Sequence, residues 1–276
     1  MNEVSLVIMA AGLGTRFGDI KQLVPVGPKN EIFLDYAIRE AIQVGITKIV
    51  IVTRSTLEEK LEKHLAQYQE SGCLIEMVHQ DISEPTRNKP WGTGHAVVTA
   101  LEKATGSIIV LNADDYYGPT ALKQILNGFT GENPAILSFE LKRTLPKTGS
   151  VSRGVLQVEN KKLLKITEVH GIRNEGNSIK SNDELTIPDN TDVSMNLWAL
   201  PQKSLKILEK QWDSFISSKH SDPEAEFLLP AALQEQLQNN QIEIDVIRTT
   251  ESWIGVTNPE DLDVARNALA DVMRVE

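Results

Sequence analysis

The stretch VSLVIMAAGLGTR, residues 4–16, decides the fold class. It begins with six mostly apolar residues, a pattern typical of a strand that is buried on both faces of a parallel sheet. Small residues follow, at which the backbone can approach a ligand closely and offer its N–H groups to phosphates. Arg16 and Lys21 add two cations that suit the phosphates of a nucleoside triphosphate. The alternatives are a tight turn and a pair of solvated surface cations.

Two other phosphate-binding loops fit this stretch less well. A dinucleotide-binding loop needs its third glycine where Phe17 stands, and Gly18 comes one residue late. That loop also needs an acidic residue at the end of the second strand, where this sequence has Thr53 and Arg54. The P-loop pattern does not fit either, because no Gly-Lys-Ser/Thr follows the loop.

Strand-like and helix-like patterns alternate through the first half of the chain, which indicates βα units. There we expect strands at Val4–Met9, Lys48–Thr53, Leu74–His79 and Ser107–Leu111, and helices at Phe33–Val44, Leu57–Glu70 and Thr93–Lys103. Beyond about residue 130 we expect strands at Ala135–Lys142, Val155–Val158, Leu163–Glu168, Val193–Leu200 and Ile242–Ile247, and helices at Gln202–Ser217, Glu224–Asn239 and Pro259–Met273. The polar stretch Arg173–Asn190 is predicted to form a mobile flap.

This order of elements predicts an α/β fold. Right-handed crossovers would cover both faces of the sheet with helices and give a three-layer α/β/α sandwich. The expected sheet is Rossmann-like, mixed and mostly parallel. A chain of 276 residues can fold in this way as a single domain.

The composition disfavours several classes of partner. The chain has 28 Lys and Arg against 38 Asp and Glu, a net charge of −10, so we expect no nucleic acid, which needs a positive face. Cys73 is the only cysteine and can form neither an internal disulfide nor a cysteine metal cage, which favours the cytoplasm. The apolar run Val4–Ala11 is too short to span a membrane and has no basic leader, so we expect no membrane partner and no processed leader.

The run from Ala11 to Arg16, followed by KQLVPV at residues 21–26, resembles the signature of the sugar-phosphate nucleotidyltransferases, also called nucleotide-sugar pyrophosphorylases. The resemblance implies a GT-A-like nucleotidyltransferase fold. It also implies that Arg16 and Lys21 neutralise the departing pyrophosphate, although Ile20 stands where the family usually has a proline. The residues that would wrap the triphosphate are Ala10, Ala11, Gly12, Gly14 and Thr15.

A second motif, WGTGHA at residues 91–96, opens a predicted helix with Thr93 as its expected cap. By the resemblance, Gly92 and Thr93 contact the nucleobase, and Gln80 at the end of the preceding strand reads it. The alternative is a capped helix that carries a core histidine, His95.

A third motif, NADDYYG at residues 112–118, ends an apolar strand in the crevice where open α/β sheets bind ligands. Carboxylates there suit Mg²⁺, which needs only one or two of them beside substrate phosphates. The resemblance implies that Asp114 binds the metal. Asp115 is either a second ligand or a cap for the helix that starts near Pro119. Glycosyltransferases of similar fold also carry acidic pairs at this place.

On the acceptor side, Gly154, Glu168 and Asn196 resemble the family residues that hold the sugar of the sugar phosphate. A carboxylate and an amide can bind sugar hydroxyls both as acceptors and as donors. The family has a glycine where Leu197 stands and often a charged residue where Val169 stands. We therefore expect an unusual acceptor.

The run SWIGVTNPED, residues 252–261, resembles the closing strand of the family, which supplies a second metal contact. Thr257 stands in that place here. Threonine is a poor ligand, and Asn258, Asp261 or water are the open substitutes.

These motifs predict a Mg²⁺-dependent enzyme that transfers a nucleoside monophosphate from a nucleoside triphosphate to a phosphorylated acceptor, with a sugar 1-phosphate as the expected acceptor. Residues 1–130 would form the nucleotide-binding half, residues 131–257 the acceptor-binding half and residues 258–276 a C-terminal helix. A GT-A glycosyltransferase that uses a nucleotide sugar and a non-catalytic nucleotide sensor are the alternatives. The sequence does not indicate which base is used or whether the chain forms a homo-oligomer. The acceptor also stays open, and phosphorylated alcohols and amines such as phosphocholine are among the candidates.

Overall fold

A computed structural model of the protein describes residues 3–12, 23–82, 87–146, 149–176, 178–183, 185–256 and 261–272. The strands of its main sheet are β1 (Val4–Met9), β2 (Lys48–Thr53), β3 (Leu74–His79), β4 (Ser107–Asn112), β6 (Ala135–Glu140), β7 (Val151–Glu159), β8 (Lys162–Glu175), β9 (Ser178–Lys180), β10 (Thr186–Ile187), β11 (Asp192–Leu200) and β12 (Asp245–Thr249). They lie in the order β10-β9-β8-β12-β6-β11-β4-β1-β2-β3, and β7 pairs with β11 and β8. A separate ladder joins β5 (Asp115–Tyr116) and β13 (Ile254–Gly255).

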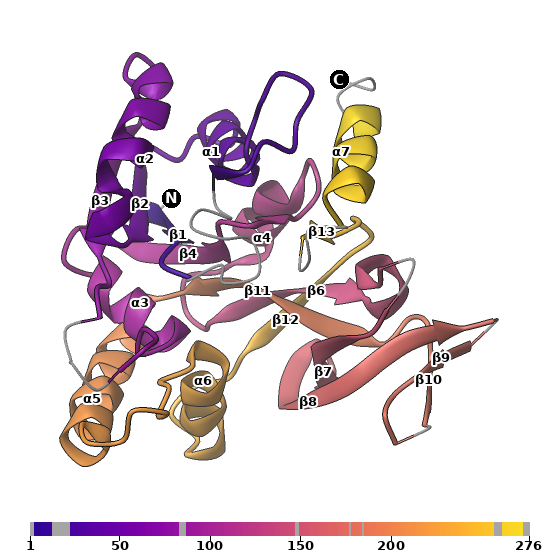
Figure 1. Ribbon diagram of the computed structural model, residues 1–276. Helices are drawn as coiled ribbons and strands as arrows, with labels where there is room; N and C mark the ends of the chain where they lie inside the picture. The colour runs from indigo at the N-terminus through magenta and orange to yellow at the C-terminus, as the bar shows by residue number, and fades with distance from the viewer. Residues whose placement is uncertain are drawn as a thin grey trace.

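Helices cover both faces of this sheet (Figure 1). One face carries α1 (Phe33–Gln43), α2 (Glu58–Leu65) and α4 (Ala121–Gly128), and the other carries α3 (Thr93–Ala100), α5 (Gln202–Lys219) and α6 (Leu229–Gln238). Successive side chains of a strand point to opposite faces, so Leu6 and Ile8 join the core cluster on the α1 side and Val7 joins the cluster on the α3 side. The chain therefore has the three expected layers.

In the part of the chain that the structure describes, one further helix and the 3₁₀ segments η3 (Ser55–Leu57), η4 (Ala66–Tyr68) and η5 (Leu141–Thr144) lie outside these layers or extend them. Helix α7 (Asp261–Val272) packs through Ala265 and Leu269 against Val26 and Phe33 in a third cluster. The helix expected at Leu57–Glu70 is thus α2 flanked by η3 and η4.

The expectation of a mostly parallel sheet is wrong for the sheet as a whole. Among the described strands, β1 pairs in parallel with β2 and β4, β2 with β3, and β6 with β12, whereas the other seven pairings are antiparallel. Parallel neighbours need a long crossover, and helical crossovers connect the strands of the first half. In the second half β7, β8, β9 and β10 follow one another through short connections, which allow only antiparallel pairing.

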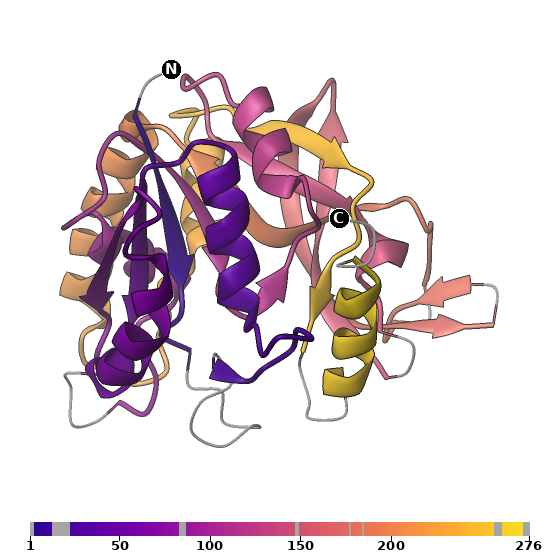
Figure 2. The same cartoon turned by 90° about the horizontal axis from the view of Figure 1, so that it is seen from above.

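Several boundaries differ from the sequence expectation in the second half. The stretch expected to be a flap, Arg173–Asn190, holds the end of β8 together with β9 and β10, and these strands project from the body of the molecule (Figure 2). Helix α6 begins at Leu229 and β12 at Asp245, both later than expected. Pro259 and Met273, the expected ends of the last helix, lie outside the described residues.

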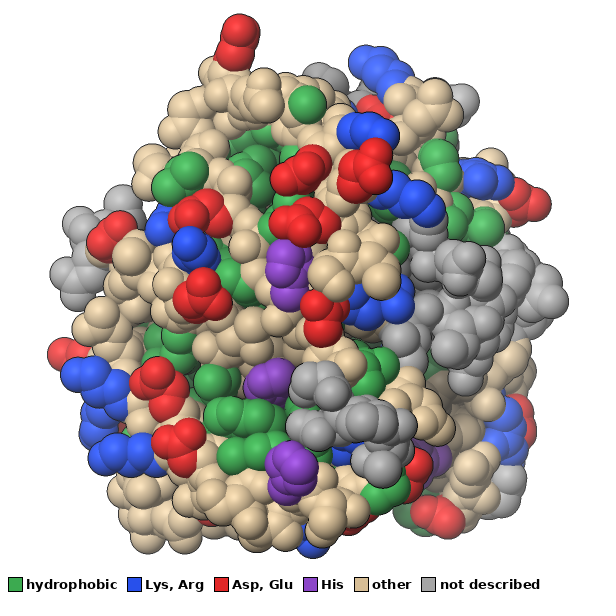
Figure 3. Space-filling view, turned by 60° about the vertical axis from the view of Figure 1, so that its left-hand side comes forward, with side chains coloured by type: hydrophobic (Ala, Val, Ile, Leu, Met, Phe, Trp, Pro, Cys, Tyr) green, Lys and Arg blue, Asp and Glu red, His purple; other side chains and the backbone are tan. Residues whose placement is uncertain are grey.

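Strand β3 lies at one edge of the sheet. Figure 3 looks onto this side of the molecule, where acidic, basic and apolar side chains are interspersed. Leu74, at the start of the strand, is 55% exposed. Within the described ranges, none of the helices combines the length and apolarity that crossing a lipid bilayer requires.

Candidate functional site

The predicted phosphate loop leaves the sheet at the carboxyl end of β1, between β2 and β4. The N–H of Ala10 donates to Val52 O over 2.7 Å, so it belongs to the sheet and is not available to a phosphate. Ala10 and Ala11 are 1% and 3% exposed, whereas Gly12 is exposed. The other predicted loop residues, Gly14, Thr15, Arg16 and Lys21, lie outside the described residues.

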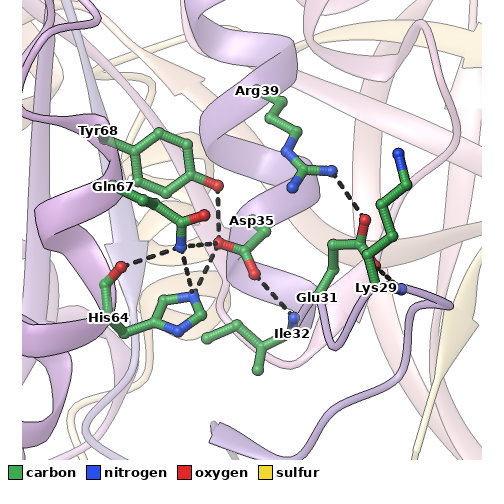
Figure 4. Close-up of polar contacts among 8 residues, drawn as sticks. All are labelled: Lys29, Glu31, Ile32, Asp35, Arg39, His64, Gln67 and Tyr68. Atoms are coloured by element: carbon green, nitrogen blue, oxygen red, sulfur yellow. Dashed lines mark hydrogen bonds and ion pairs between the residues drawn. The ribbon is translucent and has the colours of Figure 1, made fainter.

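A buried polar cluster fixes the start of α1, which follows this loop in the chain (Figure 4). Asp35 Oδ1 accepts a hydrogen bond from the Tyr68 hydroxyl over 2.7 Å and lies 2.8 Å from His64 Nε2. Asp35 Oδ2 accepts from the N–H of Ile32 over 2.8 Å. The cluster therefore joins α1 to α2 and η4.

The neighbouring carboxylate of Glu31 holds the turn that precedes α1. It accepts from the N–H of Lys29 over 2.7 Å and from Arg39 Nη1 over 3.3 Å (Figure 4). The Glu31 carbonyl accepts from the N–H of Gly27 over 2.9 Å. The segment that leads from the phosphate loop to α1 is thus tied to the helix by side-chain and backbone bonds.

On the predicted base side, Gln80 is 3% exposed and is held by the protein itself. Its Nε2 donates to Gly92 O over 2.9 Å and to His95 Nδ1 over 3.0 Å, so any hydrogen bond to a base must be accepted by its amide oxygen. Because His95 Nδ1 accepts, the ring proton lies on Nε2. Burial and the nearby Arg87 lower the pKa of His95 to about 4, so the ring is neutral at pH 7. It stacks on Trp212, with 4.2 Å between ring centroids.

The backbone at Gly92 requires glycine. Its φ is +101°, and a Cβ there would lie 2.7 Å from Phe227 O. The expectation that Thr93 caps α3 is wrong, because Gly92 is the N-cap and has no side chain to make the bond. The Thr93 hydroxyl instead accepts from the N–H of Leu229 over 3.0 Å and so satisfies the first turn of α6.

The carboxyl end of β4 carries a second polar cluster. Asp115 is 9% exposed and accepts from Asn112 Nδ2 over 2.8 Å and from the Tyr117 hydroxyl over 3.3 Å. Burial, strengthened by the charge of Asp115, raises the pKa of Tyr117, so its hydroxyl stays protonated and donates. Asp115 does not cap α4, because it lies in β5 and the N-cap residue of α4 is Thr120.

The fit of this cluster to Mg²⁺ rests on Asp114. Asp115 Oδ2 is engaged by Asn112 and Tyr117, and its Oδ1 faces Gly255 closely enough that a Cβ there would lie 2.9 Å from it. Asp114 is half-buried at the same edge of the sheet. Among the described residues there is no group of three His, Cys, Asp or Glu side chains arranged around a metal. One carboxylate fits a Mg²⁺ ion that takes its other ligands from phosphates and water.

The predicted second metal contacts fall mostly beyond the described ranges. Thr257 and Asn258 are not among the described residues, and Asp261 begins α7. The proposal that Asn258, Asp261 or water replaces Thr257 as a metal ligand thus stays a prediction.

A cavity of about 540 Å³ opens beside this cluster. Strand register brings its walls together, because Gly154 on β7 lies directly opposite Glu168 on β8 and Ser194 on β11. Gly154 leaves little spare space, since a Cβ would lie 3.1 Å from Ile166 Cγ2. The lining residues are Thr93, Asn112, Asp115, Ser152, Arg153, Gly154, Ile166, Glu168, Ser194, Met195, Asn196, Leu228, Pro230, Ala231 and Gln234. Three predicted acceptor residues and Thr93 of the base motif therefore share one cavity.

Asn196 connects this cavity to the end of β4. It lies in a β-bulge of β11 with φ +66°, a left-handed conformation that asparagine tolerates well. Its Nδ2 donates to Asn112 Oδ1 over 3.3 Å, and its Oδ1 accepts from Trp198 Nε1 over 3.1 Å. A hydrogen-bonded chain thus runs from Trp198 through Asn196 and Asn112 to Asp115. Leu197, by contrast, is fully buried in the core cluster on the α1 side.

Sequence reasoning missed Asn112, Arg153 and Gln234. Asn112 opens the NADDYYG motif, and its place at the strand end was a usable signal. Gln234 Oε1 accepts from the N–H of Ile166 over 2.8 Å and closes the α6 side of the cavity. Burial lowers the pKa of Arg153 to about 10, while Asp115 opposes the shift. Its only signal in the sequence is that it precedes Gly154.

Comparisons with known proteins agree with this arrangement. The family model described as "Nucleotidyl transferase" matches residues 5–169. The bifunctional protein GlmU of Thermodesulfovibrio yellowstonii is 31% identical over 179 residues, which cover 62% of this chain and 35% of that protein. The UTP–glucose-1-phosphate uridylyltransferase of Bacillus subtilis is 34% identical over 110 residues, which cover 33% of this chain and 37% of that protein. The chain thus matches about a third of the length of these relatives.

Two solved structures share the fold over nearly the whole chain. A Bacillus anthracis protein assigned as a glucose-1-phosphate thymidylyltransferase, in complex with a sucrose, has a TM-score of 0.67 at 17% identity and covers 97% of this chain and 96% of its own. The inositol-1-phosphate CTP transferase of T. maritima has a TM-score of 0.66 at 16% identity and covers 96% of this chain and 95% of its own. Since the family model spans more than half of the sequence, the chain belongs to the Nucleotidyl transferase family.

Proposed function

We propose that this chain transfers a nucleoside monophosphate from a nucleoside triphosphate to a phosphorylated acceptor and releases pyrophosphate. Family membership supports the reaction class. The observation that carries the finer proposal is the hydrogen-bonded chain from the acceptor cavity to the end of β4. It fixes Asn196 of the cavity wall relative to the acidic pair Asp114-Asp115 through a single intervening side chain, Asn112.

In the proposed reaction a phosphate oxygen of the acceptor attacks the α-phosphorus of the triphosphate in line, and the bond to pyrophosphate breaks. No protein nucleophile is needed, so the chain contributes positioning and charge. Asp114 would hold Mg²⁺, which when bound supplies positive charge to phosphate oxygens. Arg16 and Lys21, by the sequence resemblance, would neutralise the leaving pyrophosphate.

The residues of the two substrate sides have separate tasks in this proposal. Gly92 and the amide oxygen of Gln80 would meet the base, because the protein already occupies the N–H donors of Gln80. Glu168 would accept hydrogen bonds from hydroxyls of the acceptor, since its carboxylate is exposed at the cavity wall. Asn196 would act through the β-bulge, which sets the position of that wall.

A sugar 1-phosphate or a similar polyol phosphate is the proposed acceptor class. Two of the proteins similar to this chain carry glucose 1-phosphate in their names, and a third carries inositol 1-phosphate. The cavity combines Glu168 and Asn196 with an apolar side formed by Leu228, Pro230 and Ala231. A ring with hydroxyls on its edge and an apolar face suits such a lining.

The test is pyrophosphate release by the purified chain with Mg²⁺ and each of ATP, GTP, CTP, UTP and dTTP. Glucose 1-phosphate, inositol 1-phosphate and phosphocholine are the acceptors, and reactions that omit one substrate are the controls. We expect release that requires one triphosphate and one acceptor together.

Two results would contradict the proposal. Release of a nucleoside diphosphate from a nucleotide sugar, without pyrophosphate formation from any triphosphate, would indicate a glycosyltransferase. Calorimetric binding of a triphosphate with no turnover of any acceptor would indicate a nucleotide sensor.

A further inference from the structure

Arg153 is a half-buried cation at the edge of the acceptor cavity. Among the described residues that line the cavity it is the only basic one, beside the two carboxylates of Asp115 and Glu168. Burial lowers the pKa of Arg153 to about 10, so the guanidinium is charged at pH 7 but poorly solvated. Such a charge is stabilised when an anion enters the cavity beside it.

Neutral groups of the protein fix the direction of this guanidinium. Nε donates to Thr144 Oγ1 over 3.1 Å, Nη1 donates to Ser152 O over 2.9 Å, and Nη2 donates to Thr144 O. The ring of Trp253 lies under the guanidinium, with 4.9 Å between the central carbon and the ring centroid. These contacts hold the group in place without neutralising its charge.

The hydrogen-bond inventory leaves donors for a ligand. Three of the five N–H groups of Arg153 donate hydrogen bonds to described residues, and none of the described residues forms an ion pair with Arg153. The other two donors lie one on each terminal nitrogen. Two such donors match two oxygens of a phosphate in the forked geometry that guanidinium groups favour.

The position of Arg153 points this anion site toward the reacting end of the cavity. The carboxylate that raises the pKa of Arg153 electrostatically is Asp115, at the end of β4. The Trp253 ring reaches the same place, because a Cβ at Gly255 would meet both that ring at 2.2 Å and Asp115 Oδ1 at 2.9 Å. The opposite residue on β8, Val169, brings no charge.

We propose that Arg153 binds the phosphate of the acceptor and holds it toward the end of β4, so that the cavity selects phosphorylated over unphosphorylated acceptors. The inference rests on the proposed function for the identity of the anion. A dianionic phosphate entering a cavity with two carboxylates would otherwise be repelled, and Arg153 offsets that repulsion. Arg153 is therefore the residue that determines specificity for a phosphorylated acceptor.

The test compares Arg153→Gln and Arg153→Lys with the wild-type protein. Gln removes the charge but keeps an amide donor for Thr144, and Lys keeps the charge but loses the fork. The matched control is Arg143→Gln on the adjacent η5, because Arg143 is paired with Glu140 and does not line the cavity. Thermal unfolding of each variant checks that the fold is retained.

The first readout does not depend on turnover. Inorganic phosphate is titrated against each protein by calorimetry, and quenching of Trp253 fluorescence is followed with Trp253→Phe as the reference. We expect binding to the wild type and to Arg143→Gln, and a loss of about 10–100-fold in Arg153→Gln, the range for a hydrogen bond to a charged group. Phosphate that does not bind the wild type, or that binds Arg153→Gln equally well, overturns the inference.

The second readout separates this inference from the proposed function. With a working triphosphate and acceptor pair, we expect KM for the acceptor to rise about 10–100-fold in Arg153→Gln, with less loss in Arg153→Lys and little change in KM for the triphosphate. An unchanged KM for the acceptor overturns the role of Arg153 while the proposed function stands. Phosphate binding through Arg153 in a protein that turns over no pair supports the anion site and counts against the proposed function.

Discussion

The proposed base side and the proposed acceptor side of the site are built differently. On the base side, the protein holds Gln80 and Gly92 with its own hydrogen bonds, and Phe227 packs against the backbone. On the acceptor side, Glu168 is exposed and lines both the 540 Å³ cavity and a second cavity of about 680 Å³, whose wall includes β10. The proposed base side is thus held by the protein's own contacts, and the proposed acceptor side is open.

The largest expected effect concerns the edge of the sheet where both sides meet. Asp114→Asn should lower kcat about 10²–10³-fold, by analogy with the loss of one group that stabilises developing charge. Steady-state pyrophosphate release at saturating Mg²⁺ measures it, and Asp213→Asn, at an exposed position of α5, is the control. A kcat within a few-fold of the wild type would remove Asp114 from the proposed mechanism.

The rigid base side can be tested through its backbone. Gly92→Ala should lower the free energy of unfolding by about 2–4 kcal/mol, because it adds a close contact with Phe227 O to the strain of a positive φ. Gly72→Ala is the matched control, since Gly72 has φ +75° and a Cβ there would meet nothing within 4 Å. Chemical denaturation compares the two. Equal losses in both variants would show that packing against Phe227 contributes nothing.

The open acceptor side should respond in binding rather than in stability. Glu168→Gln should raise KM for the acceptor about 10-fold or more, since a hydrogen bond to a charged group is lost, and should leave the unfolding temperature unchanged because the side chain is exposed. Glu159→Gln, at the exposed end of β7, is the control for surface charge. An increase confined to KM for the triphosphate would place Glu168 on the wrong side of the site.

The smallest expected effect is a pH dependence of the free energy of unfolding that comes from Glu40 on α1. Burial raises the pKa of Glu40 from 4.5 to about 7, although the N–H groups of Leu122 and Lys123 at the start of α4 lower it and Glu251 raises it. Between pH 4.5 and 7 the folded state binds a proton that the unfolded state has released, so the free energy of unfolding falls as pH rises through this window.

Glu40→Gln should therefore stabilise the protein at pH 8 by about 1–3 kcal/mol and have little effect at pH 4.5. Denaturation at both pH values measures this difference. Glu132→Gln, at an exposed position after α4, is the control and should be neutral at both. A Glu40→Gln protein less stable than the wild type at pH 8 would contradict the raised pKa.

The sequence predicted the first half of the fold closely, because its signals are local. The strands β1, β2 and β3 have the expected bounds, and NADDYYG ends β4 as expected. The predicted capping role of Thr93 is wrong, because its hydroxyl accepts a hydrogen bond from Leu229, which is 136 positions away in the sequence. No local capping pattern can indicate such a partner.

The fold of the second half depends on strand pairing that no local sequence pattern encodes. Gly154, Glu168 and Asn196 do share one cavity, but the family resemblance predicted this grouping and their spacing in the sequence did not. The sheet is mostly antiparallel there because short connections replace helices. Arg153 was missed for the same reason, since its importance comes from Thr144, Trp253 and Asp115, which three different segments supply.

Nucleoside monophosphate transfer is tested most directly by following the phosphorus atoms of the triphosphate. Nucleoside triphosphate labelled either at the α- or at the γ-phosphorus is incubated with the protein, Mg²⁺ and glucose 1-phosphate or inositol 1-phosphate, and the products are separated. We expect the α-label to enter the acceptor product and the γ-label to leave as pyrophosphate in equal amount. A γ-label on the acceptor, or an acceptor product without the α-label, would contradict it.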